Sequence, residues 1–227
     1  MQSKSYFCLF PIKLQTTILP TMDPKIKARL QSKSGKTLYG YQKEAIEEMM
    51  GKFNDKSTNF NLLFQLPTGG GKTVIFSELT KRFILSTEKK VLILTHRIEL
   101  LGQTSKMLSE IGVPNKVINA KVKDLDDGKE HWCYVAMVET LNNRINDEQM
   151  VFDNLGLVIV DEAHYNSFRK LFRHFREQIL LGVTATPLSS NIKLPLNDNY
   201  NELIVGESIS SLVEQGYLAR AHTYNYD

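Results

Sequence analysis

The chain has 227 residues, 42% of them hydrophobic and 23% charged, which is ordinary for a globular protein and leaves room for one α/β domain but hardly for two. The net charge of +3 is uneven, because residues 1–36 carry seven Lys or Arg and one Asp, which leaves residues 37–227 with a net charge of −3. This balance excludes a strongly basic main domain, so any nucleic-acid contact has to come from local patches.

Residues 1–36 show no hydrophobic periodicity, and we predict a basic, flexible lead-in with some helix before a domain spanning residues 37–227. The basic arm either contacts phosphates or only keeps the chain in solution. Met22 is an alternative start, which would make residues 1–21 an extension. Residues 6–10 are apolar, but Pro11 and Lys13 follow them without a cleavage site, so we predict no signal peptide.

The two cysteines, Cys8 and Cys133, give no disulfide framework and suit a reducing compartment. The cluster of residues 131–133 is too small for a metal site. No apolar run approaches the roughly 20 residues that cross a bilayer. We therefore expect no membrane partner and a cytoplasmic location, or the host cytoplasm if the source is viral.

Residues 41–50 have helical spacing and stop near Gly51, and residues 61–65 form an apolar run that predicts a buried strand. The sequence LPTGGGKT follows at residues 66–73, and a helix is predicted from there to about residue 85. A glycine-rich turn between a strand and a helix N-terminus is the setting of a phosphate-binding loop. The strict pattern has Gly where this chain has Leu66, and the alternative is a coincidental turn. The residues expected to hold the nucleotide are Thr68, Gly69, Gly70, Gly71, Lys72 and Thr73.

A second Gly-Lys-Thr at residues 35–37 tests this interpretation. It follows a basic stretch, residues 25–31, without a strand or a run of glycines. We therefore predict a solvated loop there and no phosphate site.

Further apolar runs separated by helical segments predict a mostly parallel, twisted sheet with helices on both faces. The predicted strands are residues 90–95, 116–119, 132–137, 155–160 and 179–183, with a helix at 99–111 and a charged loop at 123–130. Ligands of such sheets bind at the carboxyl ends of the strands. Four of these ends carry reactive side chains, at residues 68–73, 95–97, 161–164 and 184–187.

Two carboxylates, Asp161 and Glu162, end the apolar run of residues 155–160. Mg²⁺ prefers oxygen ligands and keeps several waters, so Asp161 and the Thr73 hydroxyl are candidate magnesium ligands. Glu162 is then free to orient and deprotonate an attacking water. Together with Lys72, these residues predict an enzyme that uses ATP and Mg²⁺.

The segments LPTGGGKT, DEAH (residues 161–164) and LGVTATP (residues 181–187) resemble the first RecA-like motor domain of superfamily 2 helicases and translocases. The likeness extends over roughly residues 38–220 and implies a RecA-like P-loop NTPase fold. Residues 94–103 and 135–144 resemble nucleic-acid motifs of the restriction-subunit and phage or bacterial DNA-repair branch. The resemblance implies a DNA partner, single-stranded or duplex, with RNA as the alternative.

The resemblance also assigns roles to single residues. It implies that Gln42 reads the adenine, although Gln42 could instead be an exposed helix cap. It implies that the phosphate site is coupled to the nucleic acid through His164, Thr184 and Thr186. The backbone of one strand would contact Arg97, Thr140 and Arg144, and the two arginines could equally be solvated residues at helix starts.

Superfamily 2 motors use two RecA-like domains, and residues 204–218 resemble only the exit from the first. We therefore expect a second domain in the same full-length protein or in a partner chain, and slow ATP hydrolysis by this chain alone. The competing interpretations are a non-motor subunit that binds ATP and nucleic acid, and a different P-loop enzyme such as a small-molecule kinase.

Overall fold

The protein, described here from a computed structural model, is built around a parallel sheet with the strand order β3-β4-β2-β5-β6-β1-β7. The structure describes residues 22–33, 37–55, 60–122, 125, 128–146 and 152–220. The strands are β1 (Asn61–Gln65), β2 (Lys90–Thr95), β3 (Asn115–Ile118), β4 (Cys133–Met137), β5 (Leu155–Asp161), β6 (Ile179–Thr184) and β7 (Glu202–Val205). Every paired strand runs parallel to its neighbour, so their carboxyl ends lie at one edge of the sheet.

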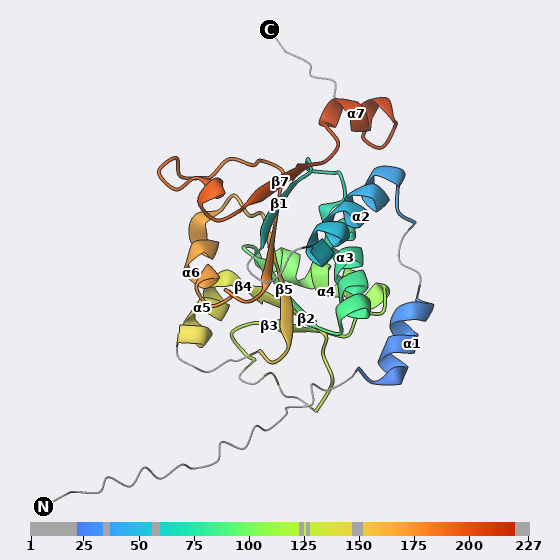
Figure 1. The fold of residues 1–227 in the computed structure, drawn as a ribbon, viewed down its shortest axis with the longest axis vertical. Helices are drawn as coiled ribbons and strands as arrows, with labels where there is room; N and C mark the ends of the chain where they lie inside the picture. The colour runs from blue at the N-terminus through green and yellow to red at the C-terminus, as the bar shows by residue number, and fades with distance from the viewer. Residues whose placement is uncertain are drawn as a thin grey trace, which may run out of the picture.

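Helices cover both faces of this sheet (Figure 1). One face carries α1 (Pro24–Ser32), α2 (Gly40–Asp55), α3 (Lys72–Thr87) and α4 (Ile98–Glu110). The other carries α5 (Val138–Asn146), the short helix η1 (Asn166–Phe168) and α6 (Arg169–Phe172). The short helix η2 (Leu196–Asp198) precedes β7, and α7 (Ile209–Glu214) follows it. This arrangement confirms the predicted α/β fold with helices on both faces of a parallel sheet.

Alternating side chains of the central strands build the two halves of the core. In β2, Val91 and Ile93 pack with the α2–α4 layer, while Leu92 and Leu94 pack with the α5–α6 layer. Successive strand residues point to opposite faces, so a strand covered on both sides needs apolar residues throughout. This is the physical reason why the apolar runs predicted these strands.

The predicted helix at residues 41–50 continues past Gly51 to Asp55. Its last turn buries Phe53, whose ring centroid lies 6.2 Å from that of Phe83 on α3. Burial of this aromatic ring offsets the cost of a glycine inside a helix, which is roughly 0.5–1 kcal/mol.

Strand β7 was not among the strands predicted from the apolar runs. This strand pairs with β1 at the edge of the sheet, and only Ile204 of its four residues is buried. An edge strand buries too few side chains to produce a continuous apolar run, so its sequence pattern is weak.

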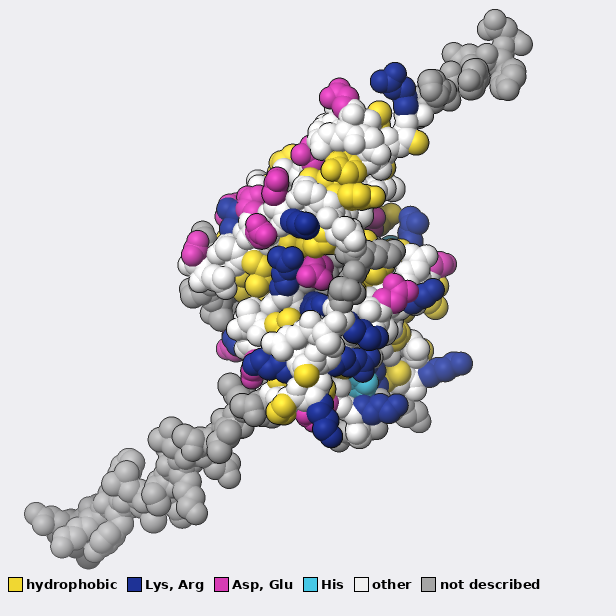
Figure 2. Space-filling view, turned by 90° about the vertical axis from the view of Figure 1, so that its right-hand side faces the viewer, with side chains coloured by type: hydrophobic (Ala, Val, Ile, Leu, Met, Phe, Trp, Pro, Cys, Tyr) yellow, Lys and Arg dark blue, Asp and Glu magenta, His cyan; other side chains and the backbone are white. Residues whose placement is uncertain are grey.

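The second half of the predicted lead-in includes α1, which packs on the end of α3. Leu30 and Met22 are buried in the core, and Lys27 forms an ion pair of 2.7 Å with Glu88. On the side that carries α1, Lys and Arg side chains gather over the lower part of the surface (Figure 2). The division of the chain at residue 37 stays a prediction, because residues 1–21 and 34–36 lie outside the described residues.

Several other predictions also concern residues beyond the described ranges, among them those for residues 6–10 and for most of the second Gly-Lys-Thr. These residues include Cys8 and much of the charged loop at 123–130. In the part of the chain that the structure describes, no helix combines the length and the apolar character that a bilayer crossing requires.

Candidate active site at the carboxyl edge of the sheet

The segment LPTGGGKT joins β1 to α3 as the sequence predicted. Gly71 is the residue before α3, with φ of 83°, and a Cβ atom built there would lie 2.6 Å from Nε2 of Gln42. This conformation and this close approach both require glycine. The loop therefore presents bare backbone at the N-terminus of a 16-residue helix, where N–H groups and the helix dipole favour an anion.

Lys72 is the first residue of α3, and its ammonium group donates to the Leu66 carbonyl across the loop at 3.3 Å. Leu66 occupies the position where the strict pattern has glycine, and its side chain is fully buried. A leucine is tolerated there because its side chain contributes to the core while its carbonyl lies within reach of Lys72.

Gln42 is buried with 4% of its surface exposed, and its amide lies against the same loop. Its Oε1 atom accepts from the Tyr39 backbone N–H at 3.0 Å, which caps the start of α2. Its Nε2 atom lies 3.4 Å from the Gly70 carbonyl, which also accepts from the Tyr41 hydroxyl at 2.9 Å. Gln42 is thus a helix cap that ties α2 to the phosphate loop, and adenine reading by its amide stays a prediction.

Asp161 ends β5 with 6% of its surface exposed. Burial raises the pKa of its carboxyl group to about 6, and the Glu162 carboxylate adds to the rise, while the Lys72 ammonium and the Glu162 N–H oppose it. The influence of Lys72 on this pKa indicates that the loop after β1 and the end of β5 lie near each other.

Glu162 adopts a left-handed backbone conformation, with φ of 54°. A non-glycine residue in this region costs of order 1–3 kcal/mol and is frequent at functional sites. Its N–H donates to Oδ1 of Asp161 at 3.0 Å, which holds the two adjacent acidic residues in a tight turn.

His164 joins this turn to β6. Its Nδ1 atom lies 3.0 Å from the Thr184 hydroxyl oxygen and 3.4 Å from Oε2 of Glu162. The Thr184 hydroxyl donates to the Thr186 carbonyl at 2.9 Å and accepts from the Thr186 N–H at 3.1 Å. Because the hydroxyl proton is already engaged, His164 must donate through Nδ1–H.

Thr184 is fully buried and also reaches the phosphate loop, since its carbonyl accepts from the Leu66 N–H at 3.0 Å. The structure therefore brings together the proposed coupling residues His164, Thr184 and Thr186, and places them beside Glu162 and the start of the loop.

The residues predicted to contact nucleic acid follow the ends of two neighbouring strands. Thr95 of β2 pairs with Met137 of β4, so Arg97 and Thr140 leave adjacent strand ends. Arg97 is exposed at the start of α4. Arg144, on α5, donates to the carbonyls of Asn119 and Ala120 at 3.1 and 2.9 Å, so its guanidinium braces the loop after β3.

The contact between the segment after α7 and the phosphate loop was not predicted. A Cβ atom at Gly69 would lie 2.9 Å from Cδ2 of Leu218, so the segment after α7 covers the loop. Beside it, the ring of Tyr217 packs on Tyr39 and Tyr41, with centroids 4.5 and 5.2 Å apart. More than 140 residues separate Leu218 from the loop, and no local pattern indicates such a contact.

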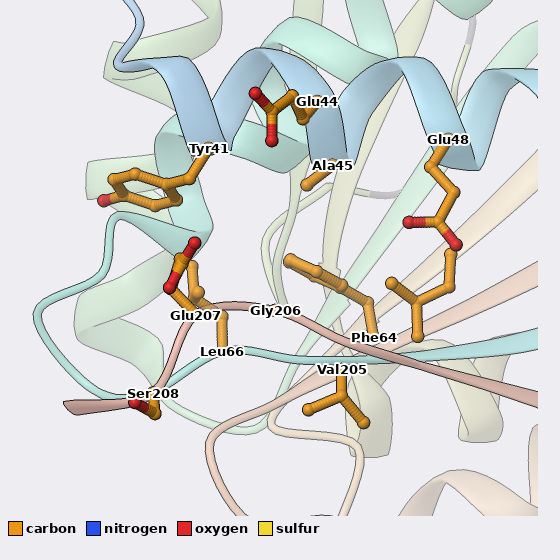
Figure 3. Close-up of a pocket in the computed structure, with 11 residues that line it drawn as sticks. Tyr41, Glu44, Ala45, Glu48, Phe64, Leu66, Val205, Gly206, Glu207 and Ser208 are labelled. Carbon is orange, nitrogen blue, oxygen red and sulfur yellow. The ribbon is translucent and has the colours of Figure 1, made fainter. Parts of the chain in front are cut away.

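A groove of about 240 Å³ lies between α2 and the chain after β7 (Figure 3). Phe64 and Leu66 are among its apolar lining residues, and its polar lining includes the carboxylates of Glu44, Glu48 and Glu207. Among the described residues, its lining contains no Lys or Arg, so the groove does not suit a polyphosphate, and the phosphate loop stays the predicted nucleotide site.

A family model described as "Type III restriction enzyme, res subunit" (ResIII) matches residues 35–189. The chain belongs to the ResIII family. The match includes the phosphate loop, the DEAH turn and LGVTATP. It confirms the resemblance to superfamily 2 helicases and identifies a RecA-like helicase motor domain.

Two curated relatives with helicase names support this assignment. IRC3 of Saccharomyces cerevisiae, whose name describes an ATP-dependent helicase, is 28% identical over 225 residues, covering 92% of this chain and 32% of IRC3. QP509L of African swine fever virus, whose name describes an ATP-dependent RNA helicase, is 28% identical over 155 residues, covering 66% of this chain and 29% of QP509L. The chain thus spans about a third of the length of these relatives.

Among solved structures, the type ISP restriction-modification enzyme LlaGI, in complex with a DNA substrate mimic, resembles this chain with a TM-score of 0.63. The match covers 80% of this chain and 21% of LlaGI at 17% sequence identity, so it establishes the shared fold.

Proposed function

We propose that this chain is the ATP-binding and hydrolysing motor domain of a DNA helicase or translocase. The observation that carries the proposal is the proximity of Lys72 and Asp161. Parallel strands β1 and β5 deliver the loop lysine and a buried carboxylate to the same edge of the sheet. A cation for the terminal phosphates beside a carboxylate for a metal is the pairing that phosphoryl transfer needs.

The residues around this pair fit ATP and Mg²⁺. The loop from Thr68 to Gly71 presents backbone to the phosphates, and the glycine at position 71 leaves that approach open. Thr73 in the first turn of α3 and Asp161 at the end of β5 supply the hard oxygen atoms that Mg²⁺ prefers. When bound, the metal neutralises charge on the phosphates, and Asp161 must be ionised to hold it.

Glu162 is the proposed general base of hydrolysis. Its carboxylate orients and deprotonates the attacking water, while Lys72 stabilises the charge on the transferred phosphoryl group. His164 donates through Nδ1–H to the Thr184 hydroxyl, and the same nitrogen lies 3.4 Å from Oε2 of Glu162, so the proposed base lies beside the end of β6.

Arg97, Thr140 and Arg144 are proposed to contact the backbone of one nucleic-acid strand. Arg97 and Thr140 leave neighbouring strand ends, on the same edge of the sheet as the nucleotide site. We favour DNA, because residues 94–103 and 135–144 resemble motifs of the restriction-subunit and DNA-repair branch and because LlaGI was solved with a DNA substrate mimic. RNA is the alternative, which the name of QP509L favours.

We also propose that a second RecA-like domain, in the same full-length protein or a partner chain, completes the motor in the cytoplasm or host cytoplasm. An arginine from a second domain accelerates related phosphoryl transfers by roughly 10³–10⁵-fold. This chain alone should therefore bind ATP–Mg²⁺ and hydrolyse it slowly.

The deciding experiment measures ATP binding and steady-state hydrolysis by the chain, alone and with single-stranded DNA, duplex DNA or RNA. Glu162→Gln should abolish the hydrolysis that is measured and leave ATP–Mg²⁺ binding intact. If RNA and not DNA stimulated ATP hydrolysis, RNA would take the place of DNA as the proposed substrate. Failure to bind ATP–Mg²⁺ would overturn the function itself, and fast hydrolysis stimulated by nucleic acid would overturn the need for a second domain.

A further inference from the structure

Three aromatic rings form a continuous stack between the end of β2 and the DEAH turn. The ring of Tyr165 lies 4.6 Å from that of His96, with 21° between their planes. The centroid of the Tyr165 ring also lies 4.2 Å from that of His164, in a tilted contact with 37° between the planes. The ring of Tyr165 thus contacts two histidines that are 68 positions apart in the sequence.

Each end of this stack is attached to a group with a proposed role. His164 contacts the Thr184 hydroxyl and lies 3.4 Å from Oε2 of Glu162. His96 directly precedes Arg97, and its Nδ1 atom lies 3.5 Å from the Ser167 hydroxyl. The stack therefore connects the proposed base of ATP hydrolysis with the loop proposed to contact the nucleic acid.

Tyr165 contacts the two histidines through its aromatic ring and not through a side-chain hydrogen bond. No hydrogen bond of the Tyr165 hydroxyl occurs among the described residues, and the residue is only half-buried. Because both neighbouring rings pack on the ring of Tyr165, a change in the position of His164 must either displace Tyr165 relative to His96 or open a gap between His164 and Tyr165.

We propose that Tyr165 is a positioning residue that couples nucleotide binding to nucleic-acid binding through His164 and His96. This inference rests on the proposed function. Coupling between two sites is reciprocal, so the nucleotide should change the affinity for nucleic acid by the same factor as the reverse. Such factors are typically about 5–150-fold.

The test measures the dissociation constant of an oligo(dT) strand with and without a saturating, non-hydrolysable ATP analogue and Mg²⁺. The ratio of the two constants is the coupling factor. In the unchanged chain we expect a factor of about fivefold or more. Tyr165→Phe should preserve it, because the stacking ring remains. Tyr165→Leu should bring it to within twofold of unity and leave each separate affinity within about threefold.

Phe172→Leu is the matched control, because it removes another half-buried ring, packed on Tyr200 at 6.1 Å and outside the stack. It should keep the coupling factor. The double variant His96→Leu with Tyr165→Leu provides a further test. Its coupling factor should be the same as that of Tyr165→Leu alone, because both changes interrupt the same contact.

If the unchanged chain binds both ligands, three results would overturn the inference. One is a coupling factor that survives Tyr165→Leu. Another is a loss of both separate affinities that Phe172→Leu reproduces, since this would indicate general destabilisation. The third is binding of both ligands without coupling in the unchanged chain, which leaves the proposed function standing. If the unchanged chain binds neither ligand, the proposed function itself fails, and the inference fails with it.

Discussion

The His164 Nδ1 atom lies 3.0 Å from the hydroxyl oxygen of Thr184, so the DEAH turn after β5 is hydrogen-bonded to the last residue of β6. The same nitrogen is 3.4 Å from the Glu162 carboxylate. A displacement of either strand end therefore alters the position of the proposed base.

Replacing the loop lysine should weaken nucleotide binding. In Lys72→Ala, the affinity for ATP–Mg²⁺ should fall by about tenfold or more, because a hydrogen bond to a charged group is worth roughly 1.5–3 kcal/mol. Isothermal titration calorimetry measures this change. Lys36→Ala, in the second Gly-Lys-Thr, is the control and should bind normally; an equal loss there would contradict our choice of loop.

The raised pKa of Asp161 predicts a pH-dependent stability difference. With a pKa of about 6 in the folded chain and an ordinary value of 3.8 in the unfolded chain, only the folded chain holds the extra proton between these values. Its stabilising contribution is complete below about pH 4 and is lost as the pH rises through about 6. Relative to Asp161→Asn, the unchanged chain should therefore lose up to about 3 kcal/mol of unfolding free energy between pH 4 and pH 7.

Urea denaturation of both chains without nucleotide, at pH 4 and pH 7, measures this difference. Comparing the two chains removes the opposite contributions of Glu88 and Asp153, whose pKa values are lowered by hydrogen bonds from Lys27 and Lys90. A difference that does not change with pH would contradict the raised pKa.

Two glycine substitutions should change stability in opposite directions. Gly71→Ala places a Cβ atom 2.6 Å from Gln42 and forces a left-handed alanine, so we expect destabilisation of about 1–3 kcal/mol. Gly102→Ala lies inside α4 with open space around it and should stabilise by about 0.5–1 kcal/mol. Thermal denaturation measures the change in stability of each variant. Equal changes in the two variants would argue against the loop geometry.

The two arginines should differ in what they do besides contacting nucleic acid. Arg97→Ala and Arg144→Ala should each weaken binding and reduce the salt dependence by about one counterion. Only Arg144→Ala should also lower the stability, by about 1 kcal/mol, because its guanidinium holds two backbone carbonyls. Binding titrations at several salt concentrations and denaturation curves separate the two effects.

Lys106→Ala is the control for these arginines, since it removes an exposed charge further along α4. It should leave both the affinity and its salt dependence nearly unchanged. If Lys106→Ala weakened binding as much as Arg97→Ala, the nucleic acid would be bound by diffuse electrostatic attraction and not by specific contacts at the edge of the sheet.

The amino-acid sequence by itself determined the central strands and the residues at their ends. Buried parallel strands need apolar side chains on both faces, so β1, β2, β5 and β6 are recognisable as continuous apolar runs. The loop glycines are equally recognisable, because backbone near a phosphate excludes side chains. The position of Asp161 and Glu162 followed from the same reasoning.

Only the tertiary structure decided which of these groups act on one another. The edge strand β7 buries one residue, and the packing of Leu218 over Gly69 depends on the chain returning across the sheet. The stack of His96, Tyr165 and His164 likewise exists because β2 and β5 are neighbours in the sheet, although β3 and β4 separate them in the chain. Strand order is a property of the whole fold, so contacts across it leave no local pattern in the sequence.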